Sequence, residues 1–193
     1  MRRSATCSER VRRAGATLFV LAALLAAGTG NAPAGVLVEA EAALKRVFPP
    51  PLVVAKKTAF LDAAQAARVE QLAGQKPPSK VVAYYAATDP ATGKPAGWAF
   101  VDTHIVRTLP ETVLVVLDPA GRVSRVEILS FNEPPEYMLT APWLAQLGGR
   151  ALDDELRLQR GIRTMAGATL SSGAMTDAVR RVLALHQVLE ATP

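Results

Sequence analysis

The chain has 193 residues, half of them hydrophobic, with 22 Lys and Arg against 17 Asp and Glu. This length fits one domain of ordinary size and excludes a large multidomain enzyme, and the apolar content excludes intrinsic disorder. Residues 1–34 supply most of the net charge of +5, since removing them leaves 17 basic and 16 acidic groups. A chain so close to neutral lacks the basic patch that nucleic-acid binding requires, so we expect no nucleic-acid partner.

Residues 1–34 have the layout of a secretory signal peptide. Arg12 and Arg13 end a basic region, an uncharged run of 14 residues follows, and small residues lead to an A-x-A site ending at Ala34. We therefore predict a signal peptide at 1–34, one domain at 35–193 and a periplasmic location. The alternative is an uncleaved membrane anchor, but this apolar run makes a helix of only about 21 Å, against roughly 30 Å of hydrocarbon. Cys7 is the only cysteine, so the predicted mature chain forms no disulfide.

The first half of the predicted domain mixes helices and strands. Helical spacing predicts a helix at 36–48, ended by three prolines, and an amphipathic helix at 58–72 with Phe60 among its residues available for burial. A short extended piece at 52–55 separates them. From Lys80 onwards the pattern favours strands, at 80–86 and 97–101, around a turn at 89–94.

The second half contains the clearest hairpin and the strongest helix. Strands are expected at 112–118 and 122–131, and imperfect alternation in the second arm indicates a bulge. A loop at 132–137, a short helix at 142–147 and a long amphipathic helix at 171–189 follow. Strands grouped between helices predict a single α+β domain, with an antiparallel sheet packed with helices and a long C-terminal helix.

The segment directly before the last helix is the part best suited to bind a ligand. Gly167 and Ala168 allow close approach to the backbone, and a helix N-terminus presents unpaired N–H groups and a positive dipole end. Thr169, Ser171 and Ser172 add hydroxyl groups. Such a site suits a phosphate group. The simpler interpretation is a tight turn in which Thr169 or Ser171 caps the helix.

At these residues the sequence resembles the FMN-binding domain family. Its members include the flavin subunits of Rnf-type electron transport complexes and of the sodium-translocating NADH:quinone reductase, and many exported single-domain proteins. The run Gly167-Ala168-Thr169-Leu170-Ser171-Ser172 matches the core of the family's attachment motif. The resemblance implies an FMN joined through its phosphate to Thr169 by a flavin transferase. It also implies that the backbone of Gly167, Ala168 and Leu170 surrounds the phosphate, with Ser171 and Ser172 supplying further hydroxyls.

The chain departs from the family pattern near this motif. Arg163 stands where the family usually has Asp, Ala166 where it has Ser or Thr, and Pro134-Pro135 replaces a Thr-Pro pair after Glu133. Arg163 and Arg160 could instead bind a phosphate without a covalent bond, because guanidinium groups pair bidentately with phosphate oxygens. The resemblance leaves Glu133 either bordering the flavin ring or as a solvated loop carboxylate.

Other candidate side chains give weaker indications. Tyr137 and Trp143 are equally compatible with the core, the rim or the surroundings of a flavin ring. His186 falls on the apolar side of the last helix and is expected in the core. His104 has no partner at metal-ligand spacing, so no metal site is predicted. No nucleophile–base arrangement stands out, so no catalytic residue is named.

The interpretation that unites these patterns is an exported, single-domain FMN protein, and the patterns favour an electron carrier over a stand-alone enzyme. Its expected partners are a flavin transferase and redox proteins, such as a membrane electron-transport complex or a cytochrome. Two alternatives stay open: a non-redox periplasmic binding or assembly module that has lost the flavin, and a flavin reductase acting on a small substrate.

Overall fold

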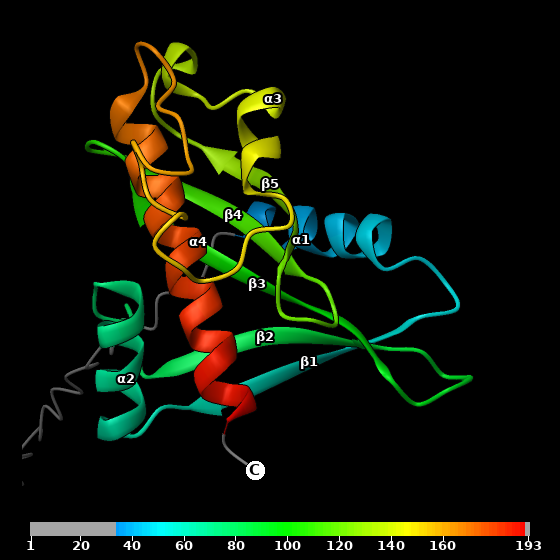
Figure 1. Ribbon diagram of the computed structural model, residues 1–193. Helices are drawn as coiled ribbons and strands as arrows, with labels where there is room; N and C mark the ends of the chain where they lie inside the picture. Colours follow the sequence, from blue (N-terminus) through cyan, green and yellow to red (C-terminus); the bar gives the residue numbers. More distant parts are fainter. Residues whose placement is uncertain (1–33, 192–193) are drawn as a thin grey trace, which may run out of the picture. The chain divides into compact units, whose positions relative to one another are not determined.

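The computed structural model describes residues 34–191. The predicted signal peptide, apart from Ala34, lies outside the described residues, as does Cys7. The described elements follow in the order α1 (Ala34–Val47), β1 (Val53–Phe60), α2 (Ala63–Ala73), β2 (Val81–Thr88), β3 (Pro95–Ile105), β4 (Pro110–Leu117), β5 (Val123–Phe131), the 3-10 turn η1 (Pro135–Tyr137), α3 (Ala141–Leu144), the 3-10 turn η2 (Ala145–Leu147) and α4 (Thr169–Glu190) (Figure 1).

The sheet has five antiparallel strands in the order β1-β2-β3-β4-β5, so each strand pairs with the strand that follows it in the chain. This confirms the predicted α+β domain, its antiparallel sheet and its long C-terminal helix. The β4–β5 hairpin is also confirmed. Between Thr112 and Val113, and again between Val116 and Leu117, the paired residue on β5 moves by two positions instead of one. These register shifts confirm the bulge expected in the second arm.

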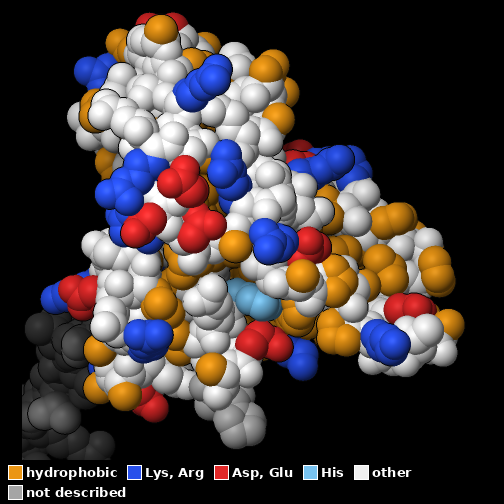
Figure 2. All heavy atoms as spheres, in the orientation of Figure 1, with side chains coloured by type: hydrophobic (Ala, Val, Ile, Leu, Met, Phe, Trp, Pro, Cys, Tyr) orange, Lys and Arg blue, Asp and Glu red, His pale blue; other side chains and the backbone are white. Residues whose placement is uncertain are grey.

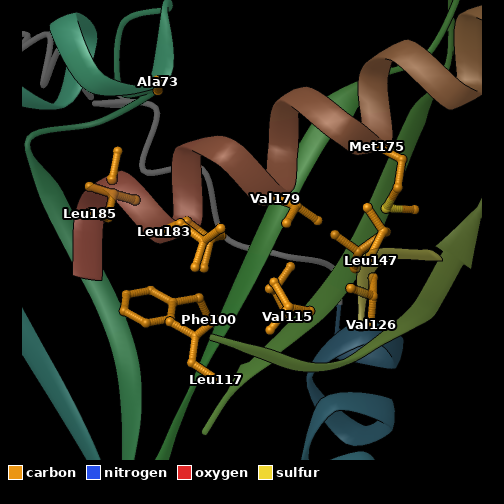
Figure 3. Close-up of a cluster of buried hydrophobic side chains, with 14 of the residues drawn as sticks. Ala73, Phe100, Val115, Leu117, Val126, Leu147, Met175, Val179, Leu183 and Leu185 are labelled. Atoms are coloured by element: carbon orange, nitrogen blue, oxygen red, sulfur yellow. The ribbon is translucent and has the colours of Figure 1, made fainter. Parts of the chain in front are cut away.

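Strand β4 lies in the middle of the molecule and is buried on both faces. Val113, Val115 and Leu117 belong to the core cluster that includes α4, whereas Leu114 and Val116 belong to a second cluster with residues of α1. Figure 3 shows side chains of α4 lying above those of β3 and β4 in the first cluster. The sheet is therefore a middle layer, with α1 on one face and α4, flanked by α2, on the other (Figure 1).

The boundary between β1 and α2 differs from the prediction. Strand β1 continues to Phe60, and the helix predicted from residue 58 begins only at Ala63. A capping box fixes this start: the Gln65 amide donates to Asp62 Oδ1 at 2.8 Å, and the Asp62 amide donates to Gln65 Oε1 at 2.9 Å. Phe60, expected to be available for burial, is 75% exposed because it ends the edge strand, opposite Val81.

A long segment without regular structure joins η2 to α4 and is held by side chains. Arg150 donates from Nε to the Gln146 carbonyl at 3.2 Å and from Nη2 to the Gly161 carbonyl at 2.8 Å. Trp143 donates from Nε1 to the Arg163 carbonyl at 2.7 Å. These bonds tie the segment to α3 and η2, and so they fix the approach of the chain to the start of α4.

The surface mixes charges and exposed hydrophobic side chains. Basic and acidic groups are interspersed over the face seen in Figure 2. Among residues 34–191, no helix is long and apolar enough to cross a membrane. The exposed large hydrophobic side chains fall into two groups: Val53, Phe60 and Val81 on β1 and β2, and Ile105, Leu109, Met138 and Leu170 elsewhere.

Candidate functional site

The chain enters α4 through a tight turn at Gly167 and Ala168. Gly167 has a φ of 79°, a left-handed conformation that glycine adopts without the strain of a side chain. Ser172 closes the turn, because its Oγ accepts a hydrogen bond from the Met165 amide at 3.0 Å and donates to the Ala168 carbonyl at 2.9 Å. The Ala168 amide donates to the Met165 carbonyl at 3.1 Å. The backbone before Thr169 is therefore held in one shape.

Thr169 is the first residue of α4 and is exposed. Its hydroxyl makes no hydrogen bond to any other residue in the described part of the chain. No side chain caps the helix at Ala168, so the first-turn amides have neither a helical nor a side-chain acceptor. Beside the turn, a Cβ placed on Gly167 would meet no atom within 4 Å. An accessible hydroxyl, free amides and the positive end of a helix dipole fit a phosphate ester.

The two serines of the predicted site have other roles. Ser171 is 1% exposed, and its Oγ donates to the Tyr137 carbonyl at 2.6 Å. Ser172 is fully buried and closes the turn before Thr169. Both hydroxyls are used within the protein, so the expectation that they face a phosphate gives way to a structural role. They fix the site by joining α4 to the segments on either side of it.

Glu133 is buried, and it organises the turn between β3 and β4. Its Oε1 accepts hydrogen bonds from the amides of Arg107 at 3.1 Å, Thr108 at 2.7 Å and Leu109 at 2.8 Å. The bonds from Thr108 and Leu109, with that from Arg107, hold the pKa of Glu133 below its ordinary value, so the carboxylate stays ionised. Glu133 is therefore not a solvated loop carboxylate, and within residues 34–191 its hydrogen bonds go to the turn between β3 and β4 and not to Thr169.

Arg163 lies beside an open groove next to the turn. Its amide donates to Gln146 Oε1 at 2.9 Å, while its side chain is exposed. The groove has a volume of about 700 Å³ and is lined by Arg150, Arg163 and Ala166 together with residues of α3. Arg160, the second arginine expected near the phosphate, lies 3.7 Å from Asp154 through Nη1 and Oδ2. Within residues 34–191 the guanidinium of Arg163 has no carboxylate or hydrogen-bond partner, whereas Arg160 has a carboxylate partner.

The two aromatic candidates separate. Trp143 is 6% exposed and belongs to the core. Tyr137 is only partly buried, and the guanidinium carbon of Arg107 lies 4.7 Å from its ring centroid. Because Ser171 donates to the Tyr137 carbonyl, this arginine–tyrosine pair is connected to the first turn of α4.

Sequence reasoning missed a buried ionic cluster on β3, β4 and α4. His104 contacts Asp102 Oδ1 through Nδ1 at 3.0 Å and Glu111 Oε2 through Nε2 at 3.1 Å. Arg181 donates to both oxygens of Asp102, at 2.8 and 2.7 Å. Burial by itself would lower the pKa of His104, but the bonds to Asp102 and Glu111 outweigh it and raise the pKa to about 9. His104 is therefore doubly protonated at neutral pH and donates from both nitrogens.

The cluster and the second histidine carry no metal site. No group of three or more His, Cys, Asp or Glu side chains within the described residues is arranged to hold a metal ion. His186 is 8% exposed and packs edge-on against Trp98, with ring centroids 4.3 Å apart. This confirms the prediction that His186 is a core residue, and burial lowers its pKa.

The model of the FMN-binding domain family matches residues 109–184. The chain carries an FMN-binding domain. The matched segment contains β4, β5, the turns and short helices after them, and most of α4, so it includes Glu133, Arg163 and the whole Gly167–Ser172 run. FMN is the cofactor that this domain indicates. No curated protein and no solved structure matches the chain.

Proposed function

We propose that this FMN-binding domain is an exported electron carrier whose FMN is attached through its phosphate to Oγ1 of Thr169. The observation that carries the proposal is the state of Thr169: the residue is exposed, and among the described residues its hydroxyl has no hydrogen-bond partner and no side chain caps the helix that it begins, inside the segment that matches the family. When bound, FMN accepts and donates one or two electrons, and the protein supplies attachment, orientation and electrostatics.

The residues around Thr169 have distinct tasks in this proposal. Gly167 and Ala168 shape the turn, and Ser172 holds it. The amides at the start of α4, among them those of Thr169 and Leu170, face the negative charge of the phosphodiester, which the helix dipole also favours. Arg163, with its exposed guanidinium, adds positive charge on the side of the groove. Thr169 itself and Leu170 are accessible to a flavin transferase.

Attachment replaces one phosphorus–oxygen bond by another. Oγ1 of Thr169 bonds to the phosphorus of an activated FMN donor, the leaving group departs from that phosphorus with the bonding electron pair, and the proton of the hydroxyl passes to the leaving group. The chain consequently gains the mass of FMN less one water. The same gain is available to serine but not to alanine at this position.

The experiment is the intact mass of the chain produced in an exporting host that has a flavin transferase. Wild type should show the added mass, Thr169→Ala should lack it, and Thr169→Ser serves as the matched control that keeps a hydroxyl. Protein that is unmodified but yellow would replace the covalent link with noncovalent FMN, and Arg163→Gln would then be tested for loss of colour. Unmodified, colourless protein would overturn the electron-carrier proposal in favour of a binding or assembly module.

Export is tested by the same sample. An intact mass that corresponds to a chain beginning at Gly35 would support the predicted signal peptide. An intact mass that includes residues 1–34 would favour the uncleaved anchor. Redox partners are proposed only as a class, namely proteins that deliver electrons to FMN or take them from it. Stopped-flow mixing of the reduced, loaded protein with candidate cytochromes would measure whether the flavin is reoxidised by them.

A further inference from the structure

Arg107 is a cation that contacts an aromatic ring and whose side-chain donors have no acceptor among the described residues. It lies in the turn between β3 and β4, two residues before the segment that matches the family. Its guanidinium carbon is 4.7 Å from the centroid of the Tyr137 ring, a distance typical of a cation–π contact. No carboxylate of the described residues lies within 4.0 Å of this guanidinium, and its side-chain N–H groups donate to no described residue.

Glu133 gives Arg107 its position. One oxygen of the carboxylate accepts hydrogen bonds from the amides of Arg107, Thr108 and Leu109, and so it holds the backbone of the turn in place. An ionised carboxylate that accepts hydrogen bonds from three amides is a strong constraint, because a hydrogen bond to a charged acceptor is stronger than one to a neutral acceptor. Glu133 thus acts on the site through Arg107.

Tyr137 connects this cation to the attachment residue. Its carbonyl accepts from Ser171 Oγ at 2.6 Å, and Ser171 follows Thr169 by two residues in the first turn of α4. The two segments joined by this bond also carry exposed hydrophobic side chains: Leu170 is 56% exposed and Met138 is 42% exposed. A hydroxyl, exposed apolar side chains and a cation therefore lie on, or in contact with, the two segments that this hydrogen bond joins.

We propose that Arg107 contacts the ring end of FMN attached at Thr169 and stabilises its reduced form, with Glu133 as the positioning residue. This inference rests on the proposed function. Leu170 and Met138 offer an apolar surface to a flat ring, and covering them removes hydrophobic area from water. Reduction adds negative charge to the ring, and a guanidinium beside that charge raises the reduction potential of the flavin.

The test compares Arg107→Gln with Arg107→Lys, Glu133→Gln and the surface control Arg125→Gln, each shown by intact mass to carry flavin. We expect Arg107→Gln to shift the two-electron equilibrium toward oxidised flavin about tenfold, which corresponds to a potential lower by about 30 mV. Glu133→Gln should lower the potential less, Arg107→Lys should restore part of it, and Arg125→Gln should leave it unchanged. A loaded Arg107→Gln protein with the wild-type reduction potential would overturn the inference. It would also be overturned if Arg163→Gln lowered the potential and Arg107→Gln did not.

A second readout removes the covalent link. Thr169→Ala is titrated with riboflavin, which has the ring and no phosphate, in its oxidised and reduced forms. Adding Arg107→Gln should weaken binding of reduced riboflavin about tenfold more than binding of oxidised riboflavin. Absence of flavin on the wild-type chain would mean failure of the proposed function. Riboflavin affinity that is equal with and without Arg107→Gln, or absent in both, would separately overturn the role of Arg107.

Discussion

The start of α4 and the body of the same helix differ in burial and in the partners of their side chains. At the start, Thr169 and Leu170 are exposed and no side chain caps the helix. From Met175 to Val188, every side chain except those of Asp177 and Gln187 is buried. Even the two arginines of this part have internal partners, since Arg180 donates to backbone carbonyls and Arg181 pairs with Asp102. The body anchors the helix together with Ser171 and Ser172, and this leaves Thr169 and Leu170 without a structural role.

The largest expected effect comes from breaking the buried ion pair of the body. Arg181→Met leaves Asp102 and Glu111 in the core with only His104 as a cationic partner. Breaking a buried pair in this way costs about 3–5 kcal/mol, because one charge is left uncompensated. Urea unfolding followed by circular dichroism measures the loss. Arg125→Met is the control, because its pair with Glu127 is exposed and is expected to change stability by less than about 1 kcal/mol. Equal losses in both variants would contradict the comparison.

The next effect is a pH dependence carried by His104, which faces Asp102, Glu111 and, through Asp102, Arg181. Its pKa is about 9 in the folded protein and ordinary in the unfolded chain, near 6.5. Its contribution is therefore fully present below pH 6.5 and is lost as the pH rises through about 9. The loss amounts to about 3 kcal/mol at most. The unfolding free energy of wild type should fall across this pH range, and that of His104→Gln should change less. If the two pH profiles were parallel, His104 would not be the source of the pH dependence.

A smaller effect is expected at the turn itself. Gly167→Ala places a side chain at a φ of 79°, and it should cost about 1 kcal/mol through backbone strain alone, because the space around this position is open. Gly173→Ala is the matched variant inside α4, where the new Cβ meets only Leu158 at an ordinary 3.7 Å. It should stabilise the protein by up to about 1 kcal/mol, through helix propensity. Thermal melts of the two variants should therefore move in opposite directions.

The smallest effect on stability is expected at the residue most important for the proposed function. Thr169→Ala removes an exposed hydroxyl without a partner and should change the unfolding free energy by no more than about 0.5 kcal/mol. Ser172→Ala removes a buried hydroxyl that makes two hydrogen bonds, and it should cost about 1–3 kcal/mol. If Thr169→Ala were the more damaging of the two, Thr169 itself would have a structural role.

Elements rich in buried apolar residues were predictable from the sequence, whereas the exposed edge strand was not. The β4–β5 hairpin and α4 show clear apolar spacing, so their existence and type followed from it. Strand β1 carries Lys56 and Lys57 and is exposed along most of its length, so it lacks the alternation that marks a strand. The start of α2 did have a signal, because Asp62 and Gln65 stand at the spacing of a capping box.

The residues of the candidate site also divide into those that a local sequence pattern indicates and those that it does not. Thr169 could be selected from the residues around it, because small residues, hydroxyls and a helix start are visible in one short run. The role of Glu133 depends on which amides face its carboxylate, and this is set by a turn more than twenty residues earlier in the chain. The ionic cluster needs the β3–β4 register, which places His104 opposite Glu111, and a contact from Arg181 on the last helix. Neither is encoded in a local pattern.

The order of the strands has a consequence for how the site is assembled. Every strand pairs with its neighbour in the chain, so the sheet forms from local contacts, which fold faster than distant ones. The last helix depends instead on distant partners, through Arg181 to Asp102 and through Ser171 to Tyr137. We therefore expect the strands to pair before α4 docks, and the surface around Thr169 to be completed by that docking. An enzyme that recognises the folded turn would have to wait for the C-terminal helix to dock, whereas one that reads an extended segment would not.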